Sequence, residues 1–309
     1  MSPRPHHSRR VDCLGLGIMP LDILYEIASY PGRGAKIDAI DFSMHCGGPV
    51  PNSFVGLHRL GLTTALIAPI GDDVFGRIAV EQQRKEGVDC RLVVHKKGPS
   101  LVAVGLIEPD GGARTMVLNR KIHVKPSDLH LSGYPIPRLI HLDGRDLKTC
   151  LKLARWGRKA GAIISFDIGT IRNDVSAIFP LVDHLVVADS YALPYTGREK
   201  AKEAITDLQK LCPGTVVITE GINGQISCER GQFVRQRAFK VNSVDQTGAG
   251  DAFHAGYIFA LLNGLTLADR LRYGSAVAAL KCTKRGGRDG LPTLSQLNRF
   301  LKGNPSTYA

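Results

Sequence analysis

Short, continuously apolar segments alternate with helical patterns along most of the chain, and this alternation limits its fold more than any other feature. Segments of this kind are typical of parallel strands, which are buried on both sides and connected by helices. The sequence therefore predicts an α/β fold with a mostly parallel central sheet and helices on both faces. The predicted strands are residues 11–17, 64–70, 139–143, 163–167, 185–188 and 216–219, and the predicted helices are 51–60, 74–86, 148–160, 200–211, 250–263, 267–282 and 294–302.

Two regions break this alternation. Residues 36–45 and 91–118 contain strand-like segments and turns but no helical pattern. Because consecutive strands without a helical crossover pair antiparallel, we expect a small β-sheet lid formed by about residues 34–46 and 90–120. The prediction for the whole chain is a single domain over residues 11–301. Residues 1–10 are basic and have no apolar stretch, so they are predicted to be a disordered tail.

The composition excludes several classes of protein. There are 40 Lys and Arg against 28 Asp and Glu, a formal net charge of +12, but aromatic residues make up only 6%. A nucleic-acid binder would cluster its basic residues and interleave aromatic ones, so we expect no nucleic-acid partner. The apolar run 255–262 is far shorter than the ~20 residues of a membrane span. Seven cysteines without a Cys-x-x-Cys pair are typical of reduced thiols, so we expect a cytoplasmic protein without membrane contact.

The segment with the clearest chemical meaning is residues 244–253. Gly248, Ala249 and Gly250 open a buried helix, and the unpaired N–H groups at its start form an anion site suited to a phosphoryl group. Asp251 lies at the same place, where its carboxylate can accept a proton from an attacking hydroxyl. The alternative is a glycine-flanked helix start in which Asp251 only stabilises the helix dipole.

The order of these residues favours the first interpretation. Asp-x-Thr-Gly-Ala-Gly-Asp at 245–251 resembles the signature of the ribokinase-like (PfkB-type) carbohydrate kinases. Gly-Gly-Pro-Val-Pro-Asn at 47–52 and Ile-Gly-Asp-Asp-Val-Phe-Gly at 70–76 resemble the N-terminal signature of that family. The resemblance extends from about residue 11 to residue 301. Within the family, residues 115–119, 140–145 and 277–290 are most similar to ketohexokinase and the sulfofructose kinases.

The resemblance implies a ribokinase-like fold with a β lid and assigns a role to each matching residue. Asp251 would be the catalytic base, and Gly248, Ala249 and Gly250 the anion hole. The positions that match the sugar-binding residues are Asp22, Gly48, Asn52, Asn119 and Arg145. The positions that match the turn at the nucleotide phosphates are Thr219, Gly221 and Gly224. Asp245 and Thr247 match a monovalent-cation site, for K⁺, although a bound Lys or Arg could supply the same charge.

Several of these positions also have simpler interpretations. Asp22 could be a turn residue, and Asn52 could cap its helix. Residues 219–224 could form a plain β-turn. Arg145 could form a surface ion pair with Asp143 or Asp146. Residues 284–288 could be a solvated loop or a wall of the nucleotide or cation site.

One departure from the family pattern concerns Mg²⁺. Family members usually have Asn-x-x-Glu after the strand that ends at residue 188, and this pair organises the water shell of the ion. Here the two positions are Ala188 and Tyr191, which cannot do so. We expect Asp189 or Asp167 to take this role, because the charge of ATP must be offset during phosphoryl transfer.

Taken together, the residues and the resemblance predict an ATP- and Mg²⁺-dependent kinase that phosphorylates a primary hydroxyl of a sugar. A ketose is the expected substrate, and a sulfosugar, another anionic sugar or a nucleoside are the alternatives. A non-catalytic sugar sensor would not need Asp251 and its anion hole. A dinucleotide-dependent oxidoreductase is excluded because Pro20 stands where Gly-x-Gly-x-x-Gly requires its last glycine. The resemblance also implies a homodimer that forms through the lid.

Overall fold

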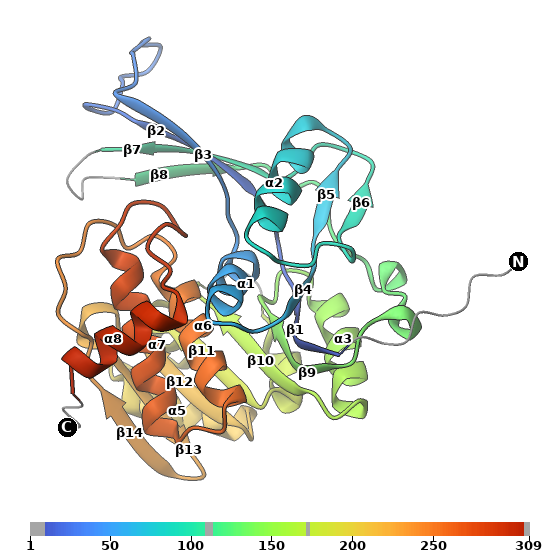
Figure 1. Ribbon diagram of the computed structural model, residues 1–309, viewed down its shortest axis with the longest axis vertical. Helices are drawn as coiled ribbons and strands as arrows, with labels where there is room; N and C mark the ends of the chain where they lie inside the picture. Colours follow the sequence, from blue (N-terminus) through green and yellow to red (C-terminus); the bar gives the residue numbers. More distant parts are fainter. Residues whose placement is uncertain (1–9, 109–113, 171–173, 306–309) are drawn as a thin grey trace, which may run out of the picture.

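The computed structural model describes residues 10–108, 114–170 and 174–305 (Figure 1). Residues 1–9 of the predicted tail lie outside the described residues. The described chain forms a large sheet covered by helices, with a smaller sheet that projects from it. No helix among the described residues is both long enough and apolar enough to cross a membrane.

Eight strands form the large sheet, in the order β14-β13-β12-β11-β10-β9-β1-β4. The six strands from β12 to β4 are parallel, whereas β13 and β14 form an antiparallel hairpin at one edge. The parallel part was predicted, and the hairpin was not. The strands are β1 (Val11–Leu16), β4 (Thr64–Ile67), β9 (Pro137–Leu142), β10 (Ile163–Ile168), β11 (His184–Ala188), β12 (Thr215–Thr219), β13 (Gln225–Glu229) and β14 (Gln232–Gln236).

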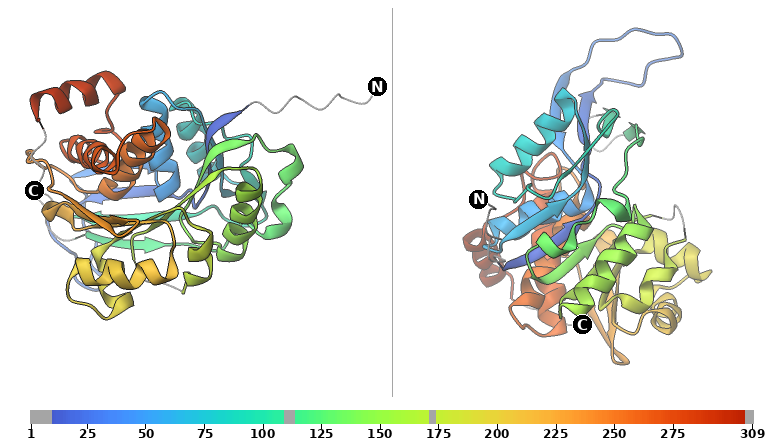
Figure 2. Two further views of the ribbon diagram at one scale, coloured as in Figure 1. Left: turned by 90° about the horizontal axis from the view of Figure 1, so that it is seen from below. Right: turned by 90° about the vertical axis from the view of Figure 1, so that its right-hand side faces the viewer.

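Helices cover both faces of the large sheet, as Figure 2 shows with the sheet seen on edge. On one face, side chains of α1 (Pro49–Arg59), α6 (Ala249–Leu262), α7 (Leu267–Cys282) and α8 (Leu294–Gly303) share a hydrophobic cluster. On the other face, α3 (Leu147–Lys159), α4 (Asp189–Thr196) and α5 (Ala201–Leu211) contribute to a second cluster. The predicted α/β fold class, with a mostly parallel sheet between two helical layers, is confirmed.

Close packing of α1 on β1 depends on glycine. A Cβ on Gly15 would lie 2.4 Å from the Val50 side chain, and one on Gly17 would lie 2.8 Å from it. The neighbouring Leu14 and Leu16 point into the cluster on the opposite face. This arrangement brings the start of α1 against the carboxyl end of β1, where open α/β sheets bind their ligands.

The smaller sheet is the lid, with strand order β3-β2-β7-β8. Its strands are β2 (Leu21–Glu26), β3 (Asp41–Cys46), β7 (Val102–Ile107) and β8 (Arg114–Leu118). The consecutive strands β2 and β3, and β7 and β8, pair antiparallel, as expected, whereas β2 and β7, which are far apart in sequence, pair parallel. Two details of the predicted lid differ. Strand β2 was not predicted, and β6 (Val94–Lys96) pairs with β5 (Pro69–Gly71) outside the lid.

The remaining elements are short or connect these layers. Helix α2 (Val74–Lys85) lies beside the lid strands β2 and β3. The predicted strand 64–70 is divided into β4 and β5. Short 3₁₀ helices are formed by Pro126–Asp128, Leu131–Gly133, Ser176–Leu181 and Gly221–Asn223.

Candidate active site

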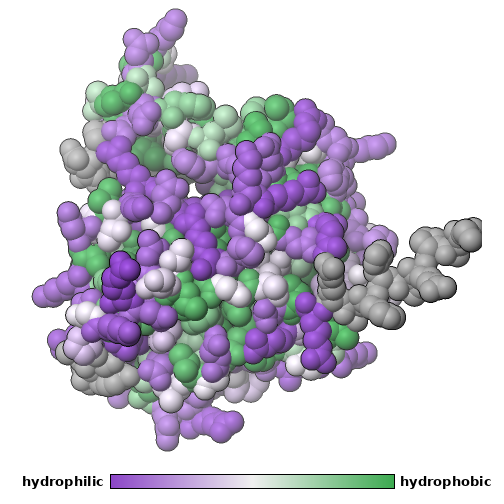
Figure 3. Space-filling model, viewed as in Figure 1, coloured by the Kyte–Doolittle hydropathy of each residue, from purple (hydrophilic) through white to green (hydrophobic). Residues whose placement is uncertain are grey.

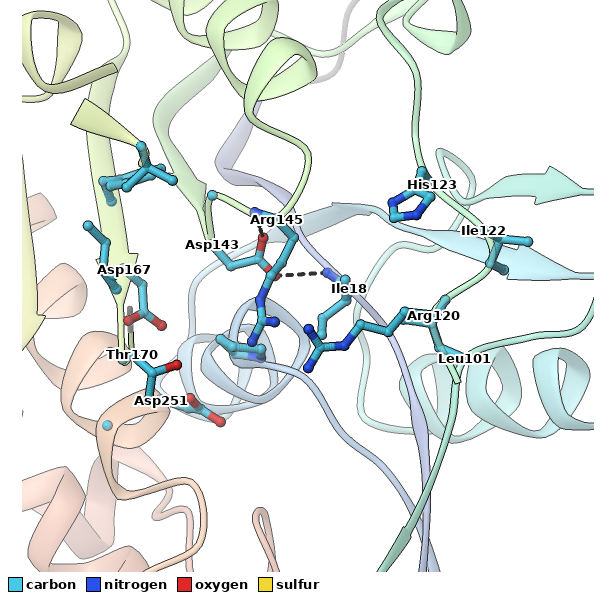
Figure 4. Close-up of a pocket in the computed structure, with 17 residues that line it drawn as sticks. Ile18, Leu101, Arg120, Ile122, His123, Asp143, Arg145, Asp167, Thr170 and Asp251 are labelled. Atoms are coloured by element: carbon cyan, nitrogen blue, oxygen red, sulfur yellow. Dashed lines mark hydrogen bonds between the residues drawn. The ribbon is translucent and has the colours of Figure 1, made fainter. Parts of the chain in front are cut away.

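A cleft of about 400 Å³ lies where the lid meets the large sheet (Figure 4). The carboxyl ends of β9 and β10 and the start of α6 form one side, and the segment that follows β8 forms the other. Ionisable side chains from all these elements face the cleft. They are Arg120, His123, Asp143, Arg145, Asp167 and Asp251.

Asp251 lies in the first turn of α6, as predicted. Gly248 is the N-cap residue and has a left-handed backbone with a φ of 74°, which glycine adopts without strain. Gly250 and Asp251 then line the cleft. The Asn52 side-chain amide donates a hydrogen bond of 2.7 Å to the Asp251 carboxylate, and the Ser53 hydroxyl donates one of 3.0 Å to its carbonyl. Helix α1 therefore holds the candidate base in place.

Burial and the negative charge of Asp167 raise the pKa of Asp251 to about 7. The hydrogen bond from Asn52 opposes this shift but does not cancel it. A carboxylate with a pKa near neutrality is well matched to accept and release a proton, which is what a general base requires.

The raised pKa of Asp251 predicts a pH dependence. Protonated Asp251 cannot accept a proton, so kcat/KM should fall about tenfold per pH unit below about pH 7. Asp167→Asn removes a negative charge that favours protonated Asp251. The acidic limb of the kcat/KM profile should therefore move to lower pH. Asp174→Asn, at an exposed position, is the matched control. An acidic limb that is the same in all three proteins would contradict this role of Asp167.

The anion hole is only partly as predicted. The amide of Ala249 donates to the carbonyl of Gln246 at 3.0 Å, so it already has a partner inside the chain. A Cβ on Gly250 would meet no atom within 4 Å, so an approaching group meets an open helix start there. The expectation for the amides of Gly248 and Gly250 stays a prediction.

Asn52 is buried and contacts the candidate base, and it does not line the cleft. Its amide NH₂ binds Asp251, and its carbonyl oxygen accepts a 2.7 Å hydrogen bond from Nε of Arg288. Arg288 is also buried, so a solvated loop at residues 284–288 is wrong for this residue. Asn52 does not cap its helix either, because the N-cap of α1 is Gly48. The structure therefore indicates a positioning role for Asn52, and its predicted contact with sugar stays a prediction.

Gly48 and Asp22 are not among the residues that line the cleft. Gly48 has a φ of 102°, and a Cβ there would lie 2.2 Å from the carbonyl oxygen of Ile18. The absent side chain at Gly48 thus makes room for the protein's own backbone, and the predicted role of this glycine in sugar binding stays a prediction. Asp22 lies in β2, so it is no turn residue, and its carboxylate packs closely against Gly47. Its contact with sugar stays a prediction.

Arg145 points into the cleft, as predicted. Its backbone amide donates to the Asp143 carboxylate at 3.1 Å, and its Nη1 is buried with no hydrogen-bond partner among the described residues. Burial lowers the pKa of Arg145, and the charge of nearby Arg120 lowers it further, while Asp143 opposes both effects. Figure 4 shows Arg120 and Arg145 extending toward the same space. The surface ion pair considered for Arg145 is therefore wrong.

Asn119 follows β8 and precedes Arg120. Its side-chain NH₂ donates to the carbonyl of Ser100 at 3.3 Å, while its carbonyl oxygen is buried without a partner among the described residues. Asn119 does not line the cleft itself, so its predicted contact with sugar stays a prediction.

Two further carboxylates, one buried and one largely buried, line the cleft. Asp143 accepts a 2.9 Å hydrogen bond from the amide of Ile18, and burial raises its pKa to about 6. Asp167 lies 3.1 Å from Nε2 of His254 on α6. Burial alone would raise the pKa of Asp167, but His254 holds it below its ordinary value. Asp167 thus stays ionised beside Asp251.

The predicted nucleotide turn lies at the carboxyl end of β12. Gly221 and Gly224 have φ values of 55° and 92°, and a Cβ on Gly224 would lie 2.1 Å from the carbonyl oxygen of Gln236. Thr219 ends the strand, and its hydroxyl lies 3.4 Å from the carbonyl oxygen of Val187. The loop lies at the carboxyl end of a parallel strand, where α/β folds bind phosphate groups. Its contact with nucleotide stays a prediction.

The two positions that depart from the family pattern are not equivalent in the structure. Ala188 is the N-cap of α4, whereas Tyr191 is buried and stacks on Tyr195 at 5.1 Å. Asp189 begins α4 next to Ala188, at the carboxyl end of β11. Because β10 and β11 are adjacent parallel strands, Asp167 and Asp189 lie at the same edge of the sheet. The described residues contain no cluster of His, Cys, Asp or Glu that forms a metal cage.

Asp245 and Thr247 lie close together in the loop before α6. One carboxylate oxygen of Asp245 accepts a 2.8 Å hydrogen bond from the amide of Thr247. The other accepts one of 2.8 Å from the amide of Gly286. Asp245 therefore joins this loop to the segment that follows α7.

Comparison with known proteins identifies the family. Residues 8–294 match the model of the pfkB family carbohydrate kinases. The chain belongs to this family. Its enzymes are sugar kinases, so the arrangement of Asp251 at the start of α6 belongs to a phosphotransferase. The predicted ribokinase-like fold and kinase activity are confirmed.

Individual relatives of this PfkB kinase are distant in sequence. It is 24% identical over 294 residues to 5-dehydro-2-deoxygluconokinase of Geobacillus thermodenitrificans, covering 86% of each chain. It is 24% identical to ribokinase of Haemophilus influenzae, covering 93% of this chain and 97% of that one. The structure of Arabidopsis thaliana ribokinase complexed with ribose and ATP superposes with a TM-score of 0.82 at 21% identity, over 95% of this chain and 99% of that one. None of these is ketohexokinase or a sulfofructose kinase, so that placement stays a prediction.

Several residues of the site were not found from the sequence of this PfkB kinase. The sequence pointed to Asn119 at the end of the lid strand, whereas the residue that lines the cleft is the next one, Arg120. His254 is one helical turn beyond Asp251, on the same face of α6, and that spacing is a signal that sequence analysis could use. Arg288 was considered only as part of the segment 284–288, and its contact with Asn52, which lies 236 positions earlier, gave no local signal.

Proposed function

We propose that this PfkB kinase transfers the γ-phosphoryl group of ATP to a primary hydroxyl of a keto sugar that carries a carboxylate or a similar anionic group. The observation that carries the proposal is the buried, unpartnered Nη1 of Arg145, which faces the same cleft as Asp251. A buried polar group without a partner costs free energy, so a ligand that supplies one binds favourably. A guanidinium binds a carboxylate through two parallel hydrogen bonds.

Arg120 supports an anionic substrate over a neutral one. Two guanidinium groups that face one cleft repel each other, and the charge of Arg120 contributes to the lowered pKa of Arg145. An anion between them would relieve this repulsion. The name of one relative, 5-dehydro-2-deoxygluconokinase, describes a keto derivative of gluconate, which carries a carboxylate.

The chemistry follows from the residues at the start of α6. Asp251 takes the proton of the sugar hydroxyl as that oxygen attacks the γ-phosphorus, and the amides of Gly248 and Gly250 receive the developing negative charge. Asn52 keeps the carboxylate of Asp251 oriented during this step. Closure of the lid excludes water that would otherwise hydrolyse ATP. The loop with Thr219, Gly221 and Gly224 binds the phosphates of ATP in this proposal.

Mg²⁺ fits the acidic residues of this site. The ion usually keeps several waters and binds through one or two carboxylates together with substrate phosphates, so it does not need a cage of protein ligands. Asp167 and Asp189 at the ends of β10 and β11 would hold its waters. When bound with ATP, Mg²⁺ offsets the charge of the phosphates.

A coupled kinase assay across matched sugars tests the proposed function. The panel pairs each keto sugar acid with the neutral ketose of the same length, and it includes ribose, a sulfosugar and nucleosides. We expect kcat/KM to be highest for a keto sugar acid. If a neutral ketose is phosphorylated as efficiently as its matching acid, the proposal of an anionic substrate is wrong. A preference for nucleosides would show that the substrate is not a free sugar.

The lid also supports the proposed homodimer. In its register Tyr25 is opposite Phe42, and Val104 is opposite Val117, so these four side chains share one face. All four are exposed, Val117 by 69%, and hydrophobic residues (green) are visible on the lid in the upper left of Figure 3. Asp22 lies on the opposite face. An exposed apolar face of this kind is suited to binding a second copy of the same chain. A measurement of the protein's mass in solution tests whether it forms a dimer.

A further inference from the structure

Lys281 is a buried lysine whose ammonium contacts the loop before α6. It is in the last turn of α7, its exposed fraction is 0%, and Nζ donates a 2.7 Å hydrogen bond to the backbone carbonyl of Asp245. Burying an ammonium group is costly unless oxygen atoms replace the water that it loses. A fully buried lysine that contacts the catalytic loop therefore needs an explanation.

The loop that Lys281 contacts is held together by Asp245. Its two carboxylate oxygens accept hydrogen bonds from Thr247 and Gly286, and its backbone amide donates to the carbonyl of Cys282 at 3.2 Å. Burial alone would raise the pKa of Asp245, but the hydrogen bonds and the charge of Lys281 hold it below its ordinary value. Asp245 and the ammonium of Lys281 thus lie at the junction between the loop before α6 and the segment after α7.

This junction orders the start of α6. Gly248 packs so closely on Gly287 that a Cβ would lie 2.9 Å from the Gly287 carbonyl oxygen. One residue later, Arg288 holds Asn52, which in turn holds Asp251. Displacement of either segment would therefore move the anion hole and the base together.

The site does not fit a free monovalent cation. Such an ion is coordinated by several carbonyl and carboxylate oxygens. Here the backbone carbonyl of Asp245 and both of its carboxylate oxygens already accept hydrogen bonds, and one of the donors is itself a cation. A second positive charge beside the Lys281 ammonium would be repelled strongly in this buried environment.

We propose that the ammonium of Lys281 takes the place of the monovalent cation, so that this kinase orders its catalytic loop without K⁺. The lysine supplies the same charge at the same loop as a permanent part of the chain. This inference rests on the kinase activity of the family and does not depend on which sugar is the substrate.

The first test uses the unaltered protein in K⁺, Na⁺ or tetramethylammonium chloride. We expect equal kcat, equal melting temperature and no binding of Tl⁺, a K⁺ analogue, in ²⁰⁵Tl NMR. The melting and NMR measurements need no sugar, so they stand even if the proposed substrate is wrong. Stimulation by K⁺ together with saturable Tl⁺ binding would overturn the proposal.

The second test is Lys281→Met, which removes the ammonium and keeps most of the apolar stem. We expect kcat in tetramethylammonium to fall at least about tenfold, because the base and anion hole lose their alignment. K⁺ or NH₄⁺ should restore much of the loss and raise the melting temperature of this variant alone. The matched control is Lys284→Met, at an exposed position three residues later. A variant that needs no cation, or a loss that no cation restores, would contradict the proposal. If the variant does not fold, Tl⁺ binding to the unaltered protein decides.

Discussion

Asp251→Asn should lower kcat by at least ~10²-fold, the usual scale for the loss of a positioned general base. The asparagine side chain has the same shape, and its carbonyl oxygen can still accept the hydrogen bond from Asn52. Fold and ATP binding should therefore be retained. What the variant loses is the ability to take a proton from the sugar hydroxyl, and the raised pKa of Asp251 indicates that its surroundings are suited to that proton transfer.

The measurement is kcat with the best sugar of the panel, together with ATP affinity and the melting temperature. Asp174→Asn, an exposed aspartate outside the cleft, is the control and should behave like the unaltered protein. A near-normal kcat for Asp251→Asn with any good substrate would remove Asp251 from the mechanism.

Arg145→Gln should have the second large effect, and that effect should depend on the substrate. With an anionic sugar, the loss of a charged partner from this buried site should cost ~2–5 kcal/mol in kcat/KM. With the matching neutral ketose the loss should be much smaller, because glutamine can still donate a hydrogen bond to a hydroxyl. Arg120→Gln should show the same preference with a smaller effect, because Arg120 is exposed.

Lys148→Gln is the matched control, since Lys148 is an exposed cation at the start of α3, near Arg145 in sequence. It should affect neither substrate. An equal, moderate loss for both sugars in Arg145→Gln would indicate hydroxyl recognition and a neutral ketose. No loss for either sugar would leave Arg145 outside the substrate site.

The elements that were predicted best have strong, continuous patterns. Helix α7 has the predicted bounds, and α6 differs by one residue at each end, because its apolar residues continue around the helix between glycine-rich boundaries. Strand β2 was missed because it is half-buried and carries Asp22 within its apolar run. The β13–β14 hairpin was missed because Arg230 and Gly231, which have φ values of 51° and 79°, form a tight turn without the usual Asn-Gly signal.

In the site, too, the residues with a local sequence pattern could be predicted, and those that depend on distant contacts could not. Asp251 could be predicted because its anion hole is contiguous with it in sequence. The roles of Asn52 and Lys281 could not, because each depends on a hydrogen bond to a residue far along the chain. Arg145 was placed at the cleft from the end of its strand, but its unpartnered guanidinium could be recognised only in the folded protein.

The residues that would select the sugar and those that carry the chemistry come from different parts of this chain. Arg120 follows a lid strand and Arg145 follows β9, whereas Asp251 is supported by Asn52 and Arg288 from α1 and the segment after α7. A substitution at either arginine leaves the hydrogen bonds of the base intact. Such a separation lets new acceptor preferences arise by few mutations during evolution, and it makes these two positions the natural starting point for redesigning the enzyme toward other sugars.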